Sequence, residues 1–218
     1  MTKYSQIAMI DILTPRSIEY YQKLRKMGVN DAIIRLSTSN YSSYFEIASI
    51  HTDLAKRSGM RVHASLATDL TNPFHDARYF FATYQRLGYS FGSKTMIQCL
   101  PDDRVKDPAK RLHELLGYIS YFVNKDDIDI AVDKRYIDEN RLKIADIPDY
   151  FNLTIINVNK LNSGIDRAGT WIYTDNFEGE LQYLGYDYYG FYTKEGYQLS
   201  LDAEYVAQEG DTWVTIAT

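Results

Sequence analysis

The feature that most constrains the fold is a repeated alternation of short apolar runs with amphipathic segments. In the first half, the apolar runs predicted as strands are 7–12, 32–36, 62–67 and 96–100. The segments with helical spacing of apolar residues are 16–27, 45–57, 74–87 and 108–123. Consecutive strand–helix units favour parallel strands joined by right-handed crossovers. The strands are nearly continuous apolar runs, as expected when both faces of a sheet are covered.

The second half repeats the pattern in shortened form. It predicts strands at 128–132, 153–158 and 170–174, a strand or rim loop at 185–192, and a short helix near 136–142. Complete units followed by abbreviated ones favour an α/β fold with a single TIM-like (β/α) barrel over an open sheet. A chain of 218 residues suits one such domain. We therefore expect a barrel over 1–200 and a separate segment over 201–218.

Composition excludes several function classes. The net charge of −5 argues against a nucleic-acid binder. No segment has the ~20 apolar residues of a membrane span, and the start of the chain lacks the apolar core of a signal peptide, which predicts synthesis in the cytoplasm. The lone Cys99 is expected in the core. The four histidines lack the spacing of a helical metal site, so neither a metal nor a cofactor is expected.

Several short segments occur in an order that is familiar from one enzyme family. Asp11 ends the first apolar run, Gly28 follows the first helix, and Arg35 ends the second apolar run. The segments 55–62, 77–81, 169–173 and 186–188 continue the series. This ordered set resembles the barrel of family 25 glycoside hydrolases, the phage-type cell-wall lysozymes. The resemblance implies a peptidoglycan muramidase that cleaves the β-1,4 bond between N-acetylmuramic acid and N-acetylglucosamine.

The fourth strand departs from the family pattern. The family ends this strand with an aspartate and a glutamate two residues apart, a spacing that places both on one face. Here these positions hold Gln98 and Leu100. Glutamine does not exchange a proton near neutral pH and leucine offers no polar atom. Ser65 and Ala67, on the third strand, also replace aromatic residues of the family.

The resemblance nevertheless implies a set of site residues. The predicted catalytic residues are Asp11, Asp187, Asp102 and Asp103. Asp102 and Asp103 follow the fourth strand and are included as replacement carboxylates, the alternative being a solvated acidic turn. The predicted substrate-binding residues are Arg35, Gln98, Trp171, Tyr173 and Tyr188.

Three interpretations stay open on the sequence. The first is a muramidase with an altered centre, and the second is an inactive barrel that binds wall glycan or a protein partner through a tyrosine-rich mouth. The third is a barrel that acts on an unrelated small molecule, which the lack of a phosphate-binding glycine loop disfavours.

The end of the chain gives a second indication of a cell-wall target. Residues 205–217, with Gly210, Asp211 and Thr212 at their centre, resemble the opening of a LysM glycan-binding module. A whole module needs about three times this length, so 201–218 is expected to be a linker and a truncated stub. The two resemblances together predict action at the bacterial wall and a phage or prophage origin. The sequence does not indicate an oligomeric state.

Overall fold

Eight strands close into one barrel in chain order, which confirms the predicted α/β barrel. The computed structural model describes residues 5–10, 14–39, 45–89 and 93–193. The strands are β1 (Ser5–Ile10), β2 (Val29–Thr38), β3 (Arg61–Thr68), β4 (Thr95–Cys99), β5 (Ile128–Asp133), β6 (Asn152–Ile156), β7 (Thr170–Phe177) and β8 (Glu180–Asp187). Neighbours from β1 to β7 pair in parallel, whereas β8 is antiparallel to both β7 and β1. The last strand therefore runs toward the end of the barrel where the others begin.

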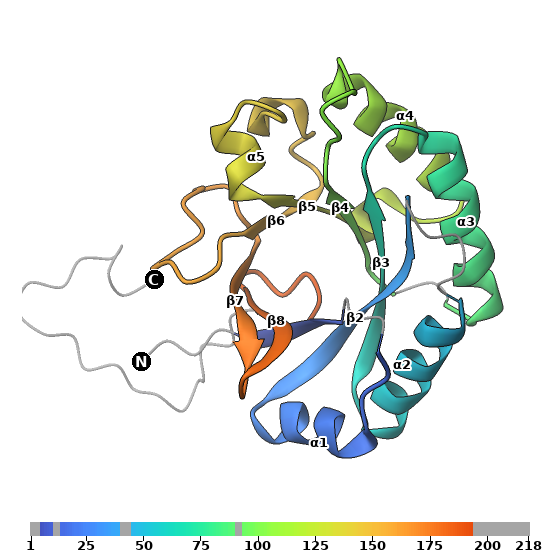
Figure 1. Ribbon diagram of the computed structural model, residues 1–218, viewed down its shortest axis with the longest axis vertical. Coiled ribbons are helices and arrows are strands. Elements are labelled where there is room, and N and C mark those ends of the chain that lie inside the picture. Colours follow the sequence, from blue (N-terminus) through green and yellow to red (C-terminus); the bar gives the residue numbers. More distant parts are fainter. Residues whose placement is uncertain (1–4, 11–13, 40–44, 90–92, 194–218) are drawn as a thin grey trace, which may run out of the picture.

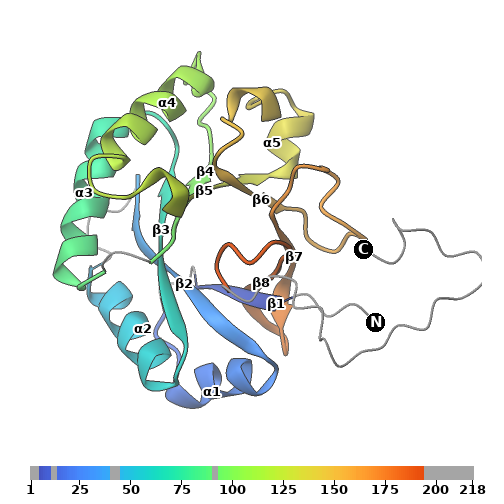
Figure 2. The ribbon, with the colours of Figure 1, turned by 180° about the vertical axis from the view of Figure 1, so that it is seen from behind.

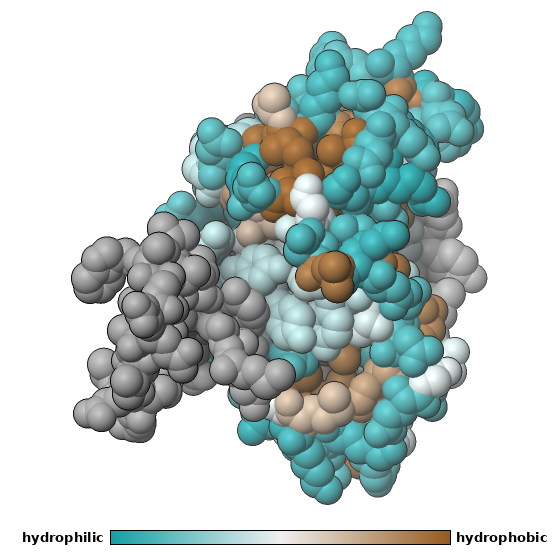
Figure 3. Space-filling model, turned by 90° about the vertical axis from the view of Figure 1, so that its left-hand side faces the viewer, coloured by the Kyte–Doolittle hydropathy of each residue, from teal (hydrophilic) through white to brown (hydrophobic). Residues whose placement is uncertain are grey.

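Helices cover the barrel unevenly. They are α1 (Ile18–Lys26), α2 (Phe45–Arg57), α3 (Pro73–Arg86), α4 (Pro108–Ile119) and the short α5 (Lys134–Asp138). The starts of α3 and α4 share one device: a proline in the first turn after Asn72 or Asp107, whose side chain accepts a backbone N–H. The helices surround the barrel except on the side of β7 (Figures 1 and 2). Figure 3 views that side and shows surface of intermediate hydropathy near its centre.

Two elements differ from the sequence prediction. Helix α5 begins at Lys134 and not near 136, because the Asp133 carboxylate accepts the Arg135 N–H at 2.8 Å and fixes the start of the helix. Strand β8 occupies Glu180–Asp187 and not 185–192. The reason is a tight turn at Glu178 and Gly179, both with positive φ, which closes a β7–β8 hairpin early.

The core has two parts. The larger lies between the strands and the helices and contains Cys99, which is fully buried as predicted. The smaller fills the barrel interior with Ile7, Met9, Ile33, Met96, Ala131, Ile156, Ile172 and Tyr192. Tyr192 comes from the loop after β8, so this loop inserts a side chain into the barrel. No helix of the described chain has the length and apolar character needed to cross a membrane.

Candidate functional site

The carboxyl ends of β1 to β7 form one end of the barrel, here called the mouth, where barrel enzymes carry their chemistry. Arg35 of β2 and Gln98 of β4 meet inside the barrel near this end. The Arg35 guanidinium donates to the Gln98 side-chain oxygen and, at 3.3 Å, to Ser65. Both side chains are buried, with residue exposures of 5% and 8%. The structure thus brings two predicted binding residues together as a neutral acceptor and a fixed cation.

A pocket of about 280 Å³ opens at the mouth over the ends of β2, β3 and β4. Its lining is Thr38, Ser39, Ala67, Thr68, Asp69, Leu100, Pro101, Asp102, Asp103, Tyr136 and Arg141. Leu100 contributes no polar side chain, and its backbone N–H donates to the Thr68 carbonyl at 2.8 Å. The carboxylates of this mouth pocket therefore come from the loops beyond the strands.

The two predicted replacement carboxylates lie on the rim of the mouth pocket and are both paired. Arg104 binds Asp102 through two guanidinium nitrogens at 2.7 and 3.0 Å. These side-chain bonds, with a backbone N–H, lower the pKa of Asp102 to about 2. Asp102 is thus ionised at neutral pH and suited to stabilising positive charge, not to donating a proton. Asp103 pairs with Arg141 at 2.8 Å, and its side chain is 90% exposed.

Two further carboxylates at the mouth were missed by the sequence analysis. Asp69 follows β3, and its Oδ1 accepts the backbone N–H and the hydroxyl of Thr71 at 2.8 and 2.6 Å. Asp133 ends β5 and caps α5. The signal that could have found them is an aspartate at the end of an apolar strand or directly after it, a position that they share with Asp11. Asp11 itself lies outside the described residues.

A buried carboxylate beneath the mouth holds the loop that carries Asp69. Asp76 accepts the hydroxyls of Ser39 and Thr68 at 2.6 and 2.7 Å. Burial raises the pKa of Asp76, although these hydrogen bonds act against the rise. The same hydroxyls accept the N–H groups of Asp69 and Leu70, both at 3.0 Å. Leu70 has a φ of 64°, a conformation uncommon for a non-glycine residue, so this network fixes an otherwise unfavourable turn.

Asp187 lies at the opposite end of the barrel because β8 runs antiparallel to both of its neighbours. Its buried carboxylate accepts the backbone N–H groups of Phe191, Tyr192 and Thr193 at 3.1, 2.9 and 2.9 Å. It also accepts the Thr193 hydroxyl at 3.0 Å. The structure therefore places this predicted catalytic residue away from the mouth, where it organises the loop after β8.

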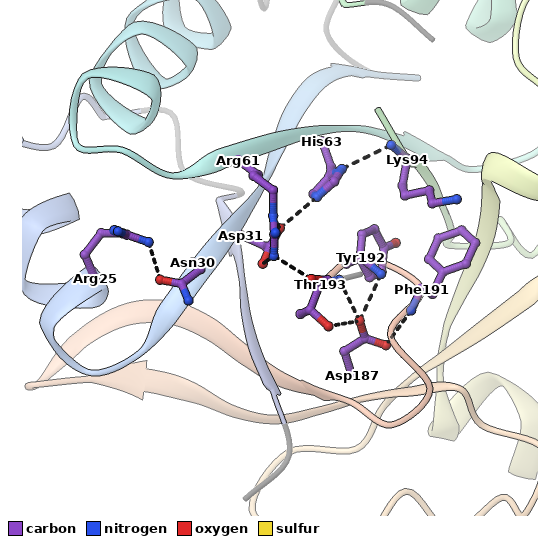
Figure 4. Close-up of polar contacts among 10 residues, drawn as sticks. All are labelled: Arg25, Asn30, Asp31, Arg61, His63, Lys94, Asp187, Phe191, Tyr192 and Thr193. Carbon is purple, nitrogen blue, oxygen red and sulfur yellow. Dashed lines mark hydrogen bonds and ion pairs between the residues drawn. The ribbon is translucent and has the colours of Figure 1, made fainter. Parts of the chain in front are cut away.

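A polar network surrounds Asp187 at this end. Arg61 binds both oxygens of Asp31 at 2.6 and 2.7 Å and donates to the Thr193 carbonyl at 2.6 Å (Figure 4). Burial acts to raise the pKa of Asp31, but hydrogen bonds from Arg61 and His63 hold it below its ordinary value. The network positions the loop after β8 against the starts of β2 and β3.

Asp129 is the third buried carboxylate at this end, after Asp187 and Asp31. It accepts from Asn152 at 2.9 Å, from Thr154 at 2.7 Å and from the Tyr192 hydroxyl. Burial outweighs these bonds and raises the pKa of Asp129 to about 6. The Tyr192 ring and hydroxyl thus join the barrel interior to this carboxylate.

The three predicted aromatic binding residues do not line the mouth. Trp171 and Tyr173 alternate with the inward-facing Ile172, which puts them on the outer face of β7. The Trp171 indole donates to the Asn157 carbonyl at 3.0 Å, and the Tyr173 ring stacks on Tyr186 with centroids 4.4 Å apart. Tyr188 follows β8 at the end opposite to the mouth.

No group of three or more histidine, cysteine, aspartate or glutamate side chains within the described ranges is arranged to hold a metal ion.

Comparisons with known proteins place the fold. No family model matches the chain, and no curated protein matches it. Solved structures do match, with identities too low to show more than the fold. One is the modular autolysin LytC from Streptococcus pneumoniae in complex with a synthetic peptidoglycan ligand: 14% identity, TM-score 0.66, covering 83% of this chain and 46% of that one. The chain thus spans about half the length of that autolysin.

Two further structures are covered almost completely. The catalytic domain of endolysin ply40 from bacteriophage P40 of Listeria monocytogenes has 11% identity and a TM-score of 0.66, covering 85% of this chain and 94% of that one. A family 25 glycosyl hydrolase from Bacillus anthracis has 15% identity and a TM-score of 0.62, covering 89% and 93%. The chain therefore has a barrel like that of the family 25 lysozymes and endolysins.

Proposed function

We propose that this protein is a peptidoglycan-directed, lysozyme-like barrel that binds wall glycan at its mouth and lacks the classical two-carboxylate hydrolysis. The similarity in fold to an autolysin, an endolysin and a family 25 hydrolase supports the wall glycan as target. The single observation that best supports the loss of classical hydrolysis is the Arg35–Gln98 hydrogen bond, because Gln98 stands where the family has an aspartate.

Glycoside hydrolysis needs a proton donor on one side of the scissile bond and a second carboxylate about 5–10 Å away. At the expected strand, Gln98 is occupied as an acceptor of Arg35 and Leu100 offers no acid. The remaining carboxylates of the described mouth each have a partner. These are Thr71 for Asp69, Arg104 for Asp102, Arg141 for Asp103 and the Arg135 backbone N–H for Asp133. A mouth of paired carboxylates and guanidinium groups is better suited to hydrogen-bonding sugar hydroxyls and amides than to proton transfer.

The setting of the proposal is the bacterial cell wall. The likeness to a bacteriophage endolysin supports a phage or prophage origin. The LysM-like segment lies outside the described residues, and its resemblance adds support for a peptidoglycan target only through sequence.

The test uses purified peptidoglycan sacculi and measures two quantities in parallel. Co-sedimentation of the protein with sacculi reports binding, and release of reducing ends with loss of turbidity reports hydrolysis. We expect saturable co-sedimentation without clearing. Clearing by the wild type that disappears in Asp11→Asn would overturn the proposal in favour of an active muramidase.

Two variants test whether the mouth is the site at which the protein binds sacculi. Arg141 lines the mouth pocket and holds Asp103, whereas Arg57 is an exposed arginine on α2 paired with Asp53. We expect Arg141→Ala to weaken co-sedimentation at least tenfold and Arg57→Ala to leave it unchanged. Equal binding by both variants would remove the mouth as the binding site.

A further inference from the structure

A second and larger pocket lies beside the mouth pocket. It has a volume of about 530 Å³ and is lined by Thr71, Arg104, Val105, Lys106, Asp107, Lys110, Arg111 and Glu114. These residues belong to the loop after β3, the loop after β4 and the first turns of α4. The two loops also carry Asp69 and Asp102 of the mouth pocket. A polymer seated at the mouth would therefore reach this rim pocket along either loop.

The rim pocket concentrates positive charge in a protein whose net charge is −5. Four of its eight lining residues are cationic, against Asp107 and Glu114. Two of the cations are engaged: Arg104 holds Asp102, and Arg111 binds Glu114 at 2.8 Å and donates to the Thr71 carbonyl at 3.4 Å.

Lys106 and Lys110 differ from these arginines. Both residues are exposed, and neither ammonium group makes an ion pair with the part of the chain that the structure describes. The carboxylate between them, Asp107, is used as the cap of α4, where it accepts the Lys110 backbone N–H at 3.0 Å. The pocket thus presents two ammonium groups that are free to pair with an external anion.

We propose that the rim pocket binds carboxylates of the peptide stems borne by the glycan strand at the mouth. The setting rests on the proposed function, since the stems project from that strand. An anion in a cationic concavity gains from hydrogen bonds in which both partners are charged, whereas a neutral sugar offers no charge to pair with the two ammonium groups. A ligand continuous with the glycan is favoured because the two pockets share both loops.

The experiment measures equilibrium binding of three soluble probes at low and high salt. A stem tetrapeptide ending in a free carboxylate tests the proposal, chitotetraose tests the mouth alone, and poly(glycerol phosphate) tests an alternative source of anions. The variant is Lys106→Ala with Lys110→Ala. Its charge-matched control, Lys26→Ala with Lys160→Ala, removes two exposed lysines elsewhere.

We expect the rim variant to bind the tetrapeptide at least tenfold more weakly than wild type, with the control within twofold and with affinity falling as salt rises. Equal tetrapeptide affinity in variant and wild type, or no binding to wild type, would overturn the proposal. If poly(glycerol phosphate) binds in a way that depends on Lys106 and Lys110 while the tetrapeptide does not bind, the assignment to peptide stems is overturned. Failure of chitotetraose alone counts against the proposed function and not against the rim pocket.

Discussion

The two ends of the barrel use polar residues in opposite ways. At the end where the parallel strands begin, Asp31, Asp129 and Asp187 are each fully buried and surrounded by donors. At the mouth, Asp102 and Asp103 sit on the rim of a solvent-accessible pocket. The difference teaches that these five carboxylates are enclosed by donors or open to solvent according to the end of the barrel at which they lie.

The largest effect is expected from removing the side chain that joins the barrel interior to the end opposite the mouth. Tyr192→Ala deletes a buried ring and leaves Asp129 without one of its donors. We expect a loss of about 3–5 kcal/mol in unfolding free energy, measured by urea denaturation. Tyr189→Ala, at a residue that is 74% exposed, is the control and is expected to change little. A small loss in Tyr192→Ala would show that this end does not depend on its buried loop.

Asp187→Asn tests whether Asp187 is structural or catalytic. The Asp187 carboxylate accepts three N–H groups and one hydroxyl, and in the variant an amide NH2 donor would face some of these donors. We expect about 2–3 kcal/mol of destabilisation by urea denaturation, with binding to sacculi unchanged in the folded variant. Normal stability combined with altered binding to sacculi would show that Asp187 acts in the functional site and is not a structural residue.

The pH dependence of stability should carry the signature of Asp129. Its pKa is about 6 in the folded protein, above its ordinary value of 3.8, so folding favours the protonated carboxyl. The stability that this group contributes is therefore fully present below about pH 4 and is lost as the pH rises through 6, by about 3 kcal/mol in total. Asp129→Asn should lack this component when unfolding is measured between pH 4 and 8. Asp126→Asn, at an exposed site, should keep it. Parallel profiles for wild type and Asp129→Asn would contradict the burial argument.

The smallest effect on stability is expected inside the mouth. Gln98→Ala removes an acceptor of the Arg35 guanidinium, and we expect a loss of about 1–2 kcal/mol together with weaker retention on sacculi. Thermal unfolding and co-sedimentation measure the two quantities. Gln22→Ala, on the exposed face of α1, should alter neither. Retention that survives Gln98→Ala would show that the Arg35–Gln98 pair only supports the fold.

The sequence predicts the fold well because burial of strands and helices depends on local periodicity. The four complete strand–helix units are recovered, with boundaries shifted by a few residues. The β7–β8 hairpin is not predicted because its two-residue turn, Glu178 and Gly179, lacks the Asn-Gly or Asp-Gly pair that is typical of such turns. The same error explains why the location of Asp187 is mispredicted. The direction of β8 decides at which end of the barrel Asp187 lies.

The candidate site is predicted less well for a related reason. The meeting of Arg35 and Gln98 follows from parallel strands and inward registers, which periodicity can indicate. The alternation of Trp171, Ile172 and Tyr173 gives two possible faces, and only the barrel closure shows that the aromatic rings face outward. Asp69 is positioned by Ser39, Thr68 and Asp76, and such a convergence of distant hydroxyls leaves no local pattern in the chain.

The antiparallel eighth strand has a practical consequence for handling the protein. Ser5 begins β1 and Thr193 is bound by Asp187, so the two outermost described residues lie at the same end of the barrel. Coupling the molecule to a resin or a sensor chip through a tether near either residue leaves the opposite end oriented toward the bulk solution. In a sample immobilised in this way, the mouth should be accessible to long, insoluble wall fragments. In a randomly attached sample, many mouths would face the support and be inaccessible to such fragments.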